Sequence, residues 1–247
     1  MPLSERIRTF LRLEDLFAQM NHFAQHDGEW HNRAELSCLL NILALSGRTD
    51  LRNEITKEIE RHTKSLVTFA QNPNVDSEKL EQTIAQLHQL NLKLVASTGR
   101  LDHIISEVEL LKALAQRNGI PGGSCDFDLP TYHFWLNKPL HERREKIQSW
   151  TANLIPIQHA ITLLLQFIRF SAIPTTKIAY SGFYQQNLGA NQSVQILRVT
   201  LESEADYFAE ISGGKHRFTV RFMKPQETER PRQVDKEINF ALSICQL

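Results

Sequence analysis

Residues 215–224 read KHRFTVRFMK and alternate between polar and apolar side chains. A period of two is typical of a β-strand buried on one side, because successive side chains point to opposite faces of a sheet. The core-facing side is expected to carry Phe218, Val220 and Phe222. The exposed side is expected to carry Lys215, Arg217, Thr219, Arg221 and Met223. Arg217 and Arg221 then lie about 13 Å apart on one face, at about 3.3 Å per residue.

The same period recurs on both sides of this strand, in Val194–Val199 and in Ile238–Cys245. Turn-forming residues separate these segments at 187–189 and 212–214, and a charged stretch covers 224–236. The sequence Gly213-Gly214-Lys215 lacks the full spacing of a phosphate-binding loop and joins two strands, so we interpret it as a hairpin turn. The C-terminal part of the chain is therefore predicted to form antiparallel β-structure.

Apolar residues recur at helical spacing through about the first 118 residues. Ser4 and Asp50 are expected to cap helices, and Gly47 is expected to end one. The next segment is rich in Gly, Pro and aromatic residues, which indicates an ordered loop with a strand at Tyr132–Leu136. Helical spacing returns after Pro139, a residue type suited to the first turn of a helix.

These patterns predict an α+β fold, with an N-terminal, mostly helical domain and a C-terminal antiparallel β-sheet domain. The expected segments are a helical domain over 1–118, a connecting loop and strand that pack with the β domain over 119–138, helices that return to the helical domain over 139–173, and the β domain over 174–247.

The 247 residues include 28 Lys and Arg and 28 Asp and Glu, so the formal net charge is zero. Bulk electrostatic binding of nucleic acid is excluded, and any basic site must be a local cluster. Cys38, Cys125 and Cys245 form no C-x-x-C motif, which argues against a zinc ribbon or a disulfide framework. The charged amino-terminal stretch does not resemble a signal peptide, and polar residues within Leu154–Ile173 favour a buried helix over a membrane span.

Three local clusters of basic residues remain. No acidic residue lies between Ser212 and Gln226, so the face of Arg217 and Arg221 either recognises an acidic peptide, phosphate or carboxylate, or is a solvated face paired with acids of neighbouring strands. Arg48 and Arg52 share one helix face, where they could bind an anion or pair with nearby acids. Arg12 could likewise belong to a solvated face, because acidic residues surround it in the sequence.

Catalytic and metal-binding patterns are weak. His26 and His31 are a candidate zinc pair, but no H-E-x-x-H motif or Cys/His cluster accompanies them. Cys125 and His133 could form a nucleophile and base, or both could be packed structural residues. The aromatic residues of the same segment could stack on nucleobases or fill a core.

Three segments together resemble one known family: IPGGSCDFDLPTYHFWL at 120–136, SGFYQQN at 181–187 and ISGGKHRFTVRFM at 211–223. The stretches RIRTFLRLEDLF and GRTDLRNEITKEIERHTKSL agree with them. The chain resembles the ZapD family of FtsZ-associated cell division proteins of proteobacteria over essentially its whole length. The resemblance implies a cytoplasmic, non-enzymatic homodimer without a cofactor, which acts at the mid-cell division site. It further implies that this dimer binds the C-terminal peptide of FtsZ and crosslinks FtsZ filaments into bundles.

The resemblance also implies partner-binding residues. Family positions associated with binding are matched by Arg12, Arg48, His133, Arg217 and Arg221. With the neighbouring Arg52 and Lys215, the arginines at 48, 217 and 221 are expected to form a basic groove for the acidic tail. Glu109 departs from the pattern, because a relative carries a basic residue at that position. An alternative is a nucleic-acid-binding regulatory module, which would need the same basic face and an exposed Tyr132 or Trp135.

Overall fold

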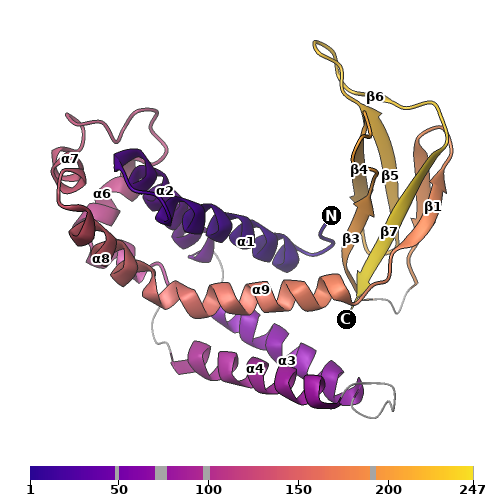
Figure 1. The fold of residues 1–247 in the computed structure, drawn as a ribbon, viewed down its shortest axis with the longest axis horizontal. Helices are drawn as coiled ribbons and strands as arrows, with labels where there is room; N and C mark the ends of the chain where they lie inside the picture. The colour runs from indigo at the N-terminus through magenta and orange to yellow at the C-terminus, as the bar shows by residue number, and fades with distance from the viewer. Residues whose placement is uncertain (48–49, 70–76, 97–100, 190–192, 247) are drawn as a thin grey trace. The chain divides into compact units, whose positions relative to one another are not determined.

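A computed structural model describes residues 1–47, 50–69, 77–96, 101–189 and 193–246 of the chain (Figure 1). It divides into two compact units. One contains Thr9–Leu164 and is helical, and the other contains Met1–Arg8 together with Leu165–Leu247 and holds all the described strands. Helices thus precede antiparallel β-structure along the chain, which confirms the predicted α+β class.

The helices occupy the first two thirds of the sequence. They are α1 (Glu5–Ala24), α2 (Glu29–Ser46), α3 (Leu51–Phe69), α4 (Ser77–Ala96), α5 (His103–Glu107), α6 (Glu109–Arg117), α7 (Pro130–Leu136), α8 (Leu140–Thr151), a 3-10 turn (Ala152–Leu154) and α9 (Ile155–Phe170). The predicted caps are confirmed: Ser4 Oγ accepts the Ile7 N–H at 3.3 Å, and Asp50 Oδ1 accepts the Asn53 N–H at 3.4 Å. Gly47 follows the end of α2, as expected.

The helical run after residue 101 is interrupted at Val108. This residue has φ −107° and ψ 105°, so it is extended and separates α5 from α6. Its N–H still donates to the Ile104 carbonyl, and its own carbonyl accepts the Lys112 N–H, both at 3.0 Å. Val108 therefore ends one helix and begins the next without losing either backbone hydrogen bond.

The strand predicted at Tyr132–Leu136 is wrong, because this segment forms α7. Pro130 occupies the first turn, and Tyr132, Trp135 and Leu136 recur at helical spacing and are all buried. Trp135 stacks against Trp150 of α8, with ring centroids 5.9 Å apart. The segment expected to pack with the β domain thus belongs to the helical unit.

One helical run, Leu140–Phe170, is long and apolar enough to cross a membrane by length and composition alone. Ile161, Leu164, Leu165 and Ile168 of this run are completely buried in the folded chain.

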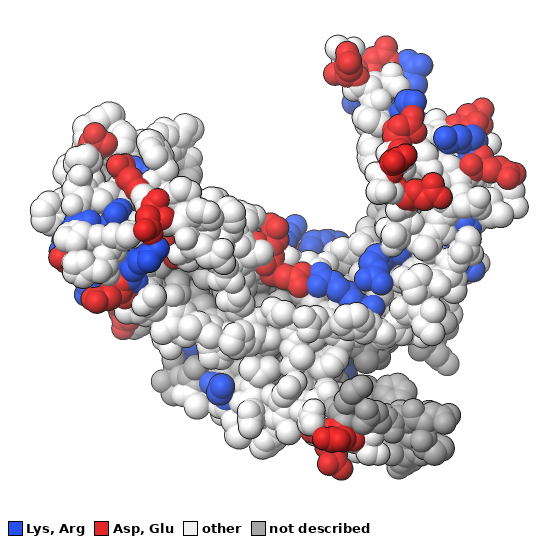
Figure 2. Space-filling view, viewed as in Figure 1, with Lys and Arg blue, Asp and Glu red and all other residues white. Residues whose placement is uncertain are grey.

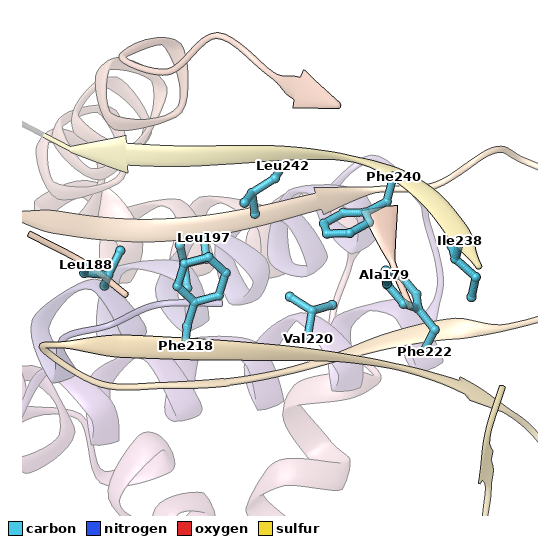
Figure 3. Packing of buried hydrophobic residues seen from close by; sticks show 9 residues of the cluster. All are labelled: Ala179, Leu188, Leu197, Phe218, Val220, Phe222, Ile238, Phe240 and Leu242. Atoms are coloured by element: carbon cyan, nitrogen blue, oxygen red, sulfur yellow. The ribbon is translucent and has the colours of Figure 1, made fainter. Parts of the chain in front are cut away.

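The second unit contains β1 (Thr175–Ala179), β2 (Phe183–Asn187), β3 (Val194–Thr200), β4 (Phe208–Gly213), β5 (Arg217–Lys224), β6 (Arg232–Gln233) and β7 (Ile238–Gln246). The strands form two antiparallel sheets. One has the order β1-β7-β3, and the other has the order β2-β5-β4, with β6 also paired to β5. Figure 3 shows that Phe218, Val220 and Phe222 of β5 point toward side chains of the opposite sheet, which include Leu197, Phe240 and Leu242.

This core confirms the predicted alternation in β5, and it decides which sheet face is available. The outer side of the β1-β7-β3 sheet is partly covered, because Ser243 and Cys245 are completely buried and Ser171 Oγ accepts the Gln246 N–H at 3.1 Å. In the β2-β5-β4 sheet the outward residues of β5 include Arg217 and Arg221, and both are exposed.

Candidate functional site

The outer side of the β2-β5-β4 sheet carries the two arginines that the sequence places on one strand face. We call this surface the arginine face. It comprises Arg217, Thr219, Arg221 and Met223 of β5, Phe183, Gln185 and Asn187 of β2, and Phe208, Glu210 and Ser212 of β4. These residues share a face because directly opposed residues of antiparallel strands project to the same side.

The register gives each arginine different neighbours. Arg221 is opposite Phe183 on one side and Glu210 on the other. Arg217 is opposite Asn187, and its carbonyl accepts the Gly214 N–H at 3.0 Å, which closes the hairpin. Arg221 therefore lies beside an aromatic ring and a carboxylate, whereas Arg217 lies beside an amide and a turn.

Neither arginine of β5 has an ion pair within 4.0 Å among the residues that the structure describes. Two other basic side chains of the same unit are paired: Lys224 Nζ lies 2.6 Å from Asp206 Oδ2, and Arg232 pairs with Glu229. The hydrogen bond and charge of Lys224 lower the pKa of Asp206. Arg217 and Arg221 are thus exposed cations without an ion pair to a described residue.

An apolar patch adjoins Arg221. Phe208 is 40% exposed, and Phe183 and Met223 are half-buried. Phe208 and Met223 are direct cross-strand partners, two residues along β5 from Arg221. A ligand on this face would therefore meet a charged part and an apolar part side by side.

Lys215 differs from the prediction. The strand begins at Arg217, so Lys215 lies in the hairpin turn and does not belong to the alternating face. The reason is the backbone hydrogen bond from the Gly214 N–H to the Arg217 carbonyl, which closes the turn immediately before the strand. Lys215 remains exposed next to Arg217 in the sequence, and Gly213-Gly214-Lys215 is confirmed as part of a hairpin.

Three of the predicted binding residues that the structure describes, Arg12, Arg52 and His133, lie on the helical unit. Arg12 of α1 is exposed and lines a shallow pocket of about 360 Å³, together with Asp15 and Asn41. Arg52, in the first turn of α3, is half-buried, and this burial lowers the pKa of its guanidinium while the charge of Asp50 opposes the shift. Arg48 lies outside the described residues.

His133 projects from α7 and is exposed. Its Nδ1 lies 3.8 Å from Asp126 Oδ1, and its Nε2 lies 3.3 Å from the Asn137 amide nitrogen. Cys125 Sγ instead contacts Asp128 Oδ2 at 3.5 Å. The two members of the suggested nucleophile pair therefore each contact a different aspartate.

The remaining alternatives find little support in the geometry. His31 lies in the first turn of α2 and stacks on His26, with ring centroids 5.1 Å apart. Within the described ranges, no group of three or more His, Cys, Asp or Glu residues is arranged to hold a metal ion. Tyr132 and Trp135 are 2% and 7% exposed, so the aromatic surface required by a nucleic-acid module is not formed by these rings.

The sequence did not identify several residues of the arginine face. Phe183, Phe208 and Glu210 enter it only through the pairing of β2 and β4 with β5.

Glu109, the residue that departs from the family pattern, lies at the start of α6, where its Oε2 is 3.5 Å from Lys112 Nζ. Figure 2 shows Lys and Arg side chains interspersed with Asp and Glu side chains on the face in view, in agreement with the balanced composition.

The chain thus combines a helical unit with an antiparallel β-sandwich, whose outer face carries exposed cations beside an apolar patch. The ZapD family model, described as a cell division protein, matches residues 11–221. The chain is 42% identical to the cell division protein ZapD of Methylococcus capsulatus over 246 residues, which is 100% of this chain and 96% of the relative. It is 37% identical to the protein of the same name from Azoarcus sp., over 100% of this chain and 98% of the relative.

The chain therefore belongs to the ZapD family of non-enzymatic cell division proteins.

Proposed function

We propose that this protein binds the C-terminal peptide of FtsZ through its basic surfaces and, as a homodimer, crosslinks FtsZ filaments into bundles that stabilise the division ring. It would act in the cytoplasm at mid-cell, without a cofactor. Membership of the ZapD family supports a role in cell division. The observation that supports the site is the arginine face, where Arg217 and Arg221 are exposed and have no carboxylate within 4.0 Å in the described structure.

The chemistry of that face suits an acidic tail. A guanidinium group donates paired hydrogen bonds to a carboxylate, and each charge-assisted hydrogen bond contributes about 1.5–3 kcal/mol. Phe183, Phe208 and Met223 add apolar surface next to Arg221. A tail that combines acidic and apolar residues would use both parts of the face, so binding would depend on composition as well as on charge.

The other predicted partner-binding residues remain part of the proposal. Arg12, Arg52 and His133 would add basic contacts on the helical unit, Arg48 would contribute next to Arg52 in the sequence, and Lys215 would extend the positive charge beyond Arg217. Arg12 and His133 are accessible for such contacts, because both side chains are exposed.

Dimerisation would turn binding into crosslinking. A dimer is expected to be isologous, with the same apolar helical surface on both copies. Once one copy holds a tail from one filament, the second site meets neighbouring tails at a raised effective concentration. Each contact can then be weak and quickly reversible, while the bundle as a whole persists.

The test is co-sedimentation with FtsZ filaments. The protein should sediment with filaments of intact FtsZ and bundle them, and it should remain in the supernatant with FtsZ that lacks its last residues. Equal sedimentation with both forms of FtsZ would show that the tail is not the binding segment.

A further inference from the structure

We propose that the arginine face selects an extended segment in which two carboxylates are separated by three residues, so that they occupy positions i and i+4. This inference rests on the proposed function, because the segment is taken to be the FtsZ tail. It adds the conformation of the bound segment and the spacing of its acids, and both follow from β5.

The spacing comes from strand geometry. Arg217 and Arg221 project from the same face of β5, four residues apart, which corresponds to about 13 Å at about 3.3 Å per residue. An extended peptide has the same rise, so acids at i and i+4 can reach both guanidinium groups. Acids at i and i+2 span only about 7 Å, and acids at i and i+3 point to opposite sides of an extended chain. A helical segment with acids at i and i+4 spans only about 6 Å.

The two cationic positions are separate, not part of one continuous basic stripe. Thr219 lies between them, is half-buried, and donates its hydroxyl hydrogen to the Ser212 carbonyl at 3.4 Å. Its cross-strand partners are Gln185 and Ser212, which carry no charge. A carboxylate placed midway between the arginines would therefore find no cation directly beneath it.

The two positions also differ in character. Beside Arg217 lie Asn187 and the turn residues Lys215 and His216, and none of these is acidic. Arg221 has Glu210 as its cross-strand partner, which makes its surroundings less positive. Two residues beyond Arg221, the pair Met223 and Phe208 offers an apolar contact. The matching segment therefore has an apolar residue two positions beyond the acid that meets Arg221.

The experiment uses the full chain and three labelled synthetic peptides of identical composition, whose two aspartates are placed at i and i+4, at i and i+3, or at i and i+2. Binding is measured by fluorescence anisotropy. The i, i+4 peptide is expected to bind about tenfold more tightly than the others, because it alone can make one more charge-assisted contact. Arg217→Gln should remove this advantage, whereas Arg198→Gln, at an exposed arginine of β3 in the other sheet, should preserve it.

Equal affinity for the three peptides would overturn the spacing rule. A parallel titration with the natural FtsZ tail peptide separates this failure from failure of the proposed function. If the tail binds and the three peptides do not differ, the function stands and the spacing rule falls. If neither the tail nor any of the peptides binds, both fall. Circular dichroism spectra of the two variants establish that each is folded.

Discussion

Arg221 of β5 lies directly opposite Glu210 of β4 in the antiparallel register, and both side chains are exposed. No ion pair within 4.0 Å joins them in the described part of the chain. Opposite charges at directly opposed positions of neighbouring strands contribute about 0.2–1 kcal/mol relative to a pair of alanines. Glu210 is therefore an internal competitor for any carboxylate that approaches Arg221.

Substitution Glu210→Gln should strengthen binding of the acidic tail, because it removes this competitor and keeps a side chain of similar size. The expected gain is about 1.4- to 5-fold in affinity, which corresponds to about 0.2–1 kcal/mol. Isothermal titration calorimetry with the FtsZ tail peptide measures it. Glu204→Gln, in the exposed loop between β3 and β4, is the matched control and should have little effect. Weaker binding by Glu210→Gln would indicate that Glu210 is itself a ligand contact.

Tail binding should weaken as ionic strength rises. The arginine face is exposed, and the Debye length falls from about 10 Å at 0.1 M salt to about 3 Å at 1 M, so salt screens the attraction before contact. Titrations of the same tail peptide at several salt concentrations measure this dependence. An affinity that does not change with salt concentration would show that the apolar patch of Phe183, Phe208 and Met223 provides the binding, and not the arginines.

Alkaline pH should destabilise the helical unit through Tyr132. Burial raises the pKa of Tyr132 from 10.0 to about 12, while Arg33 lowers it and Glu29 raises it by smaller amounts. The unfolded chain therefore loses this proton at lower pH than the folded chain. The contribution of Tyr132 to stability is present below pH 10 and is lost as the pH rises from about 10 to about 12.

The comparison of wild type with Tyr132→Phe isolates this effect from other groups that titrate at high pH. Urea unfolding at a series of pH values should show a steeper loss of the free energy of unfolding above pH 10 for the wild type. Parallel curves for the two proteins would show that the Tyr132 hydroxyl is not the titrating group.

Phe222→Ala should destabilise the β-sandwich. Phe222 is completely buried between the sheets, with its ring centroid 5.1 Å from that of Phe240. Truncation of a buried phenylalanine costs about 3–5 kcal/mol, because apolar contact is lost and a cavity remains. Thermal unfolding followed by circular dichroism should show a clear decrease in melting temperature. Phe127→Ala, at a ring that is 85% exposed, is the control and should change stability little.

The success of the sequence prediction for β5 has a simple physical reason. Phe218, Val220 and Phe222 are buried on one face while Arg217 and Arg221 remain exposed on the other, so the pattern of one strand contains the information. The pairing partners could not be predicted in this way. Glu210 and Phe183 join the arginine face through the register of separate strands, which no local pattern specifies.

The failure at α7 has the opposite cause. Tyr132, Phe134 and Trp135 are aromatic residues of the kind enriched in strands, and they outweighed the helical signals of Pro130 and the i, i+3 spacing of Tyr132 and Trp135. Packing of Trp135 on Trp150 and of Arg33 over the Tyr132 ring, at 4.9 Å, favours the helix. These contacts come from α8 and α2, so they are invisible in the segment itself.

The central claim is that Arg217 and Arg221 bind the carboxylates of the FtsZ tail. The most direct measurement is the affinity of the tail peptide for the double variant Arg217→Glu/Arg221→Glu, compared with Arg198→Glu as the control for charge reversal on the same sandwich. Both variants should keep the circular dichroism spectrum of the wild type, because all three arginines are exposed. The account predicts that the double variant loses more than about 1.5 kcal/mol of binding free energy and no longer bundles filaments, while the control binds like the wild type. Wild-type affinity and full bundling by the folded double variant would contradict it.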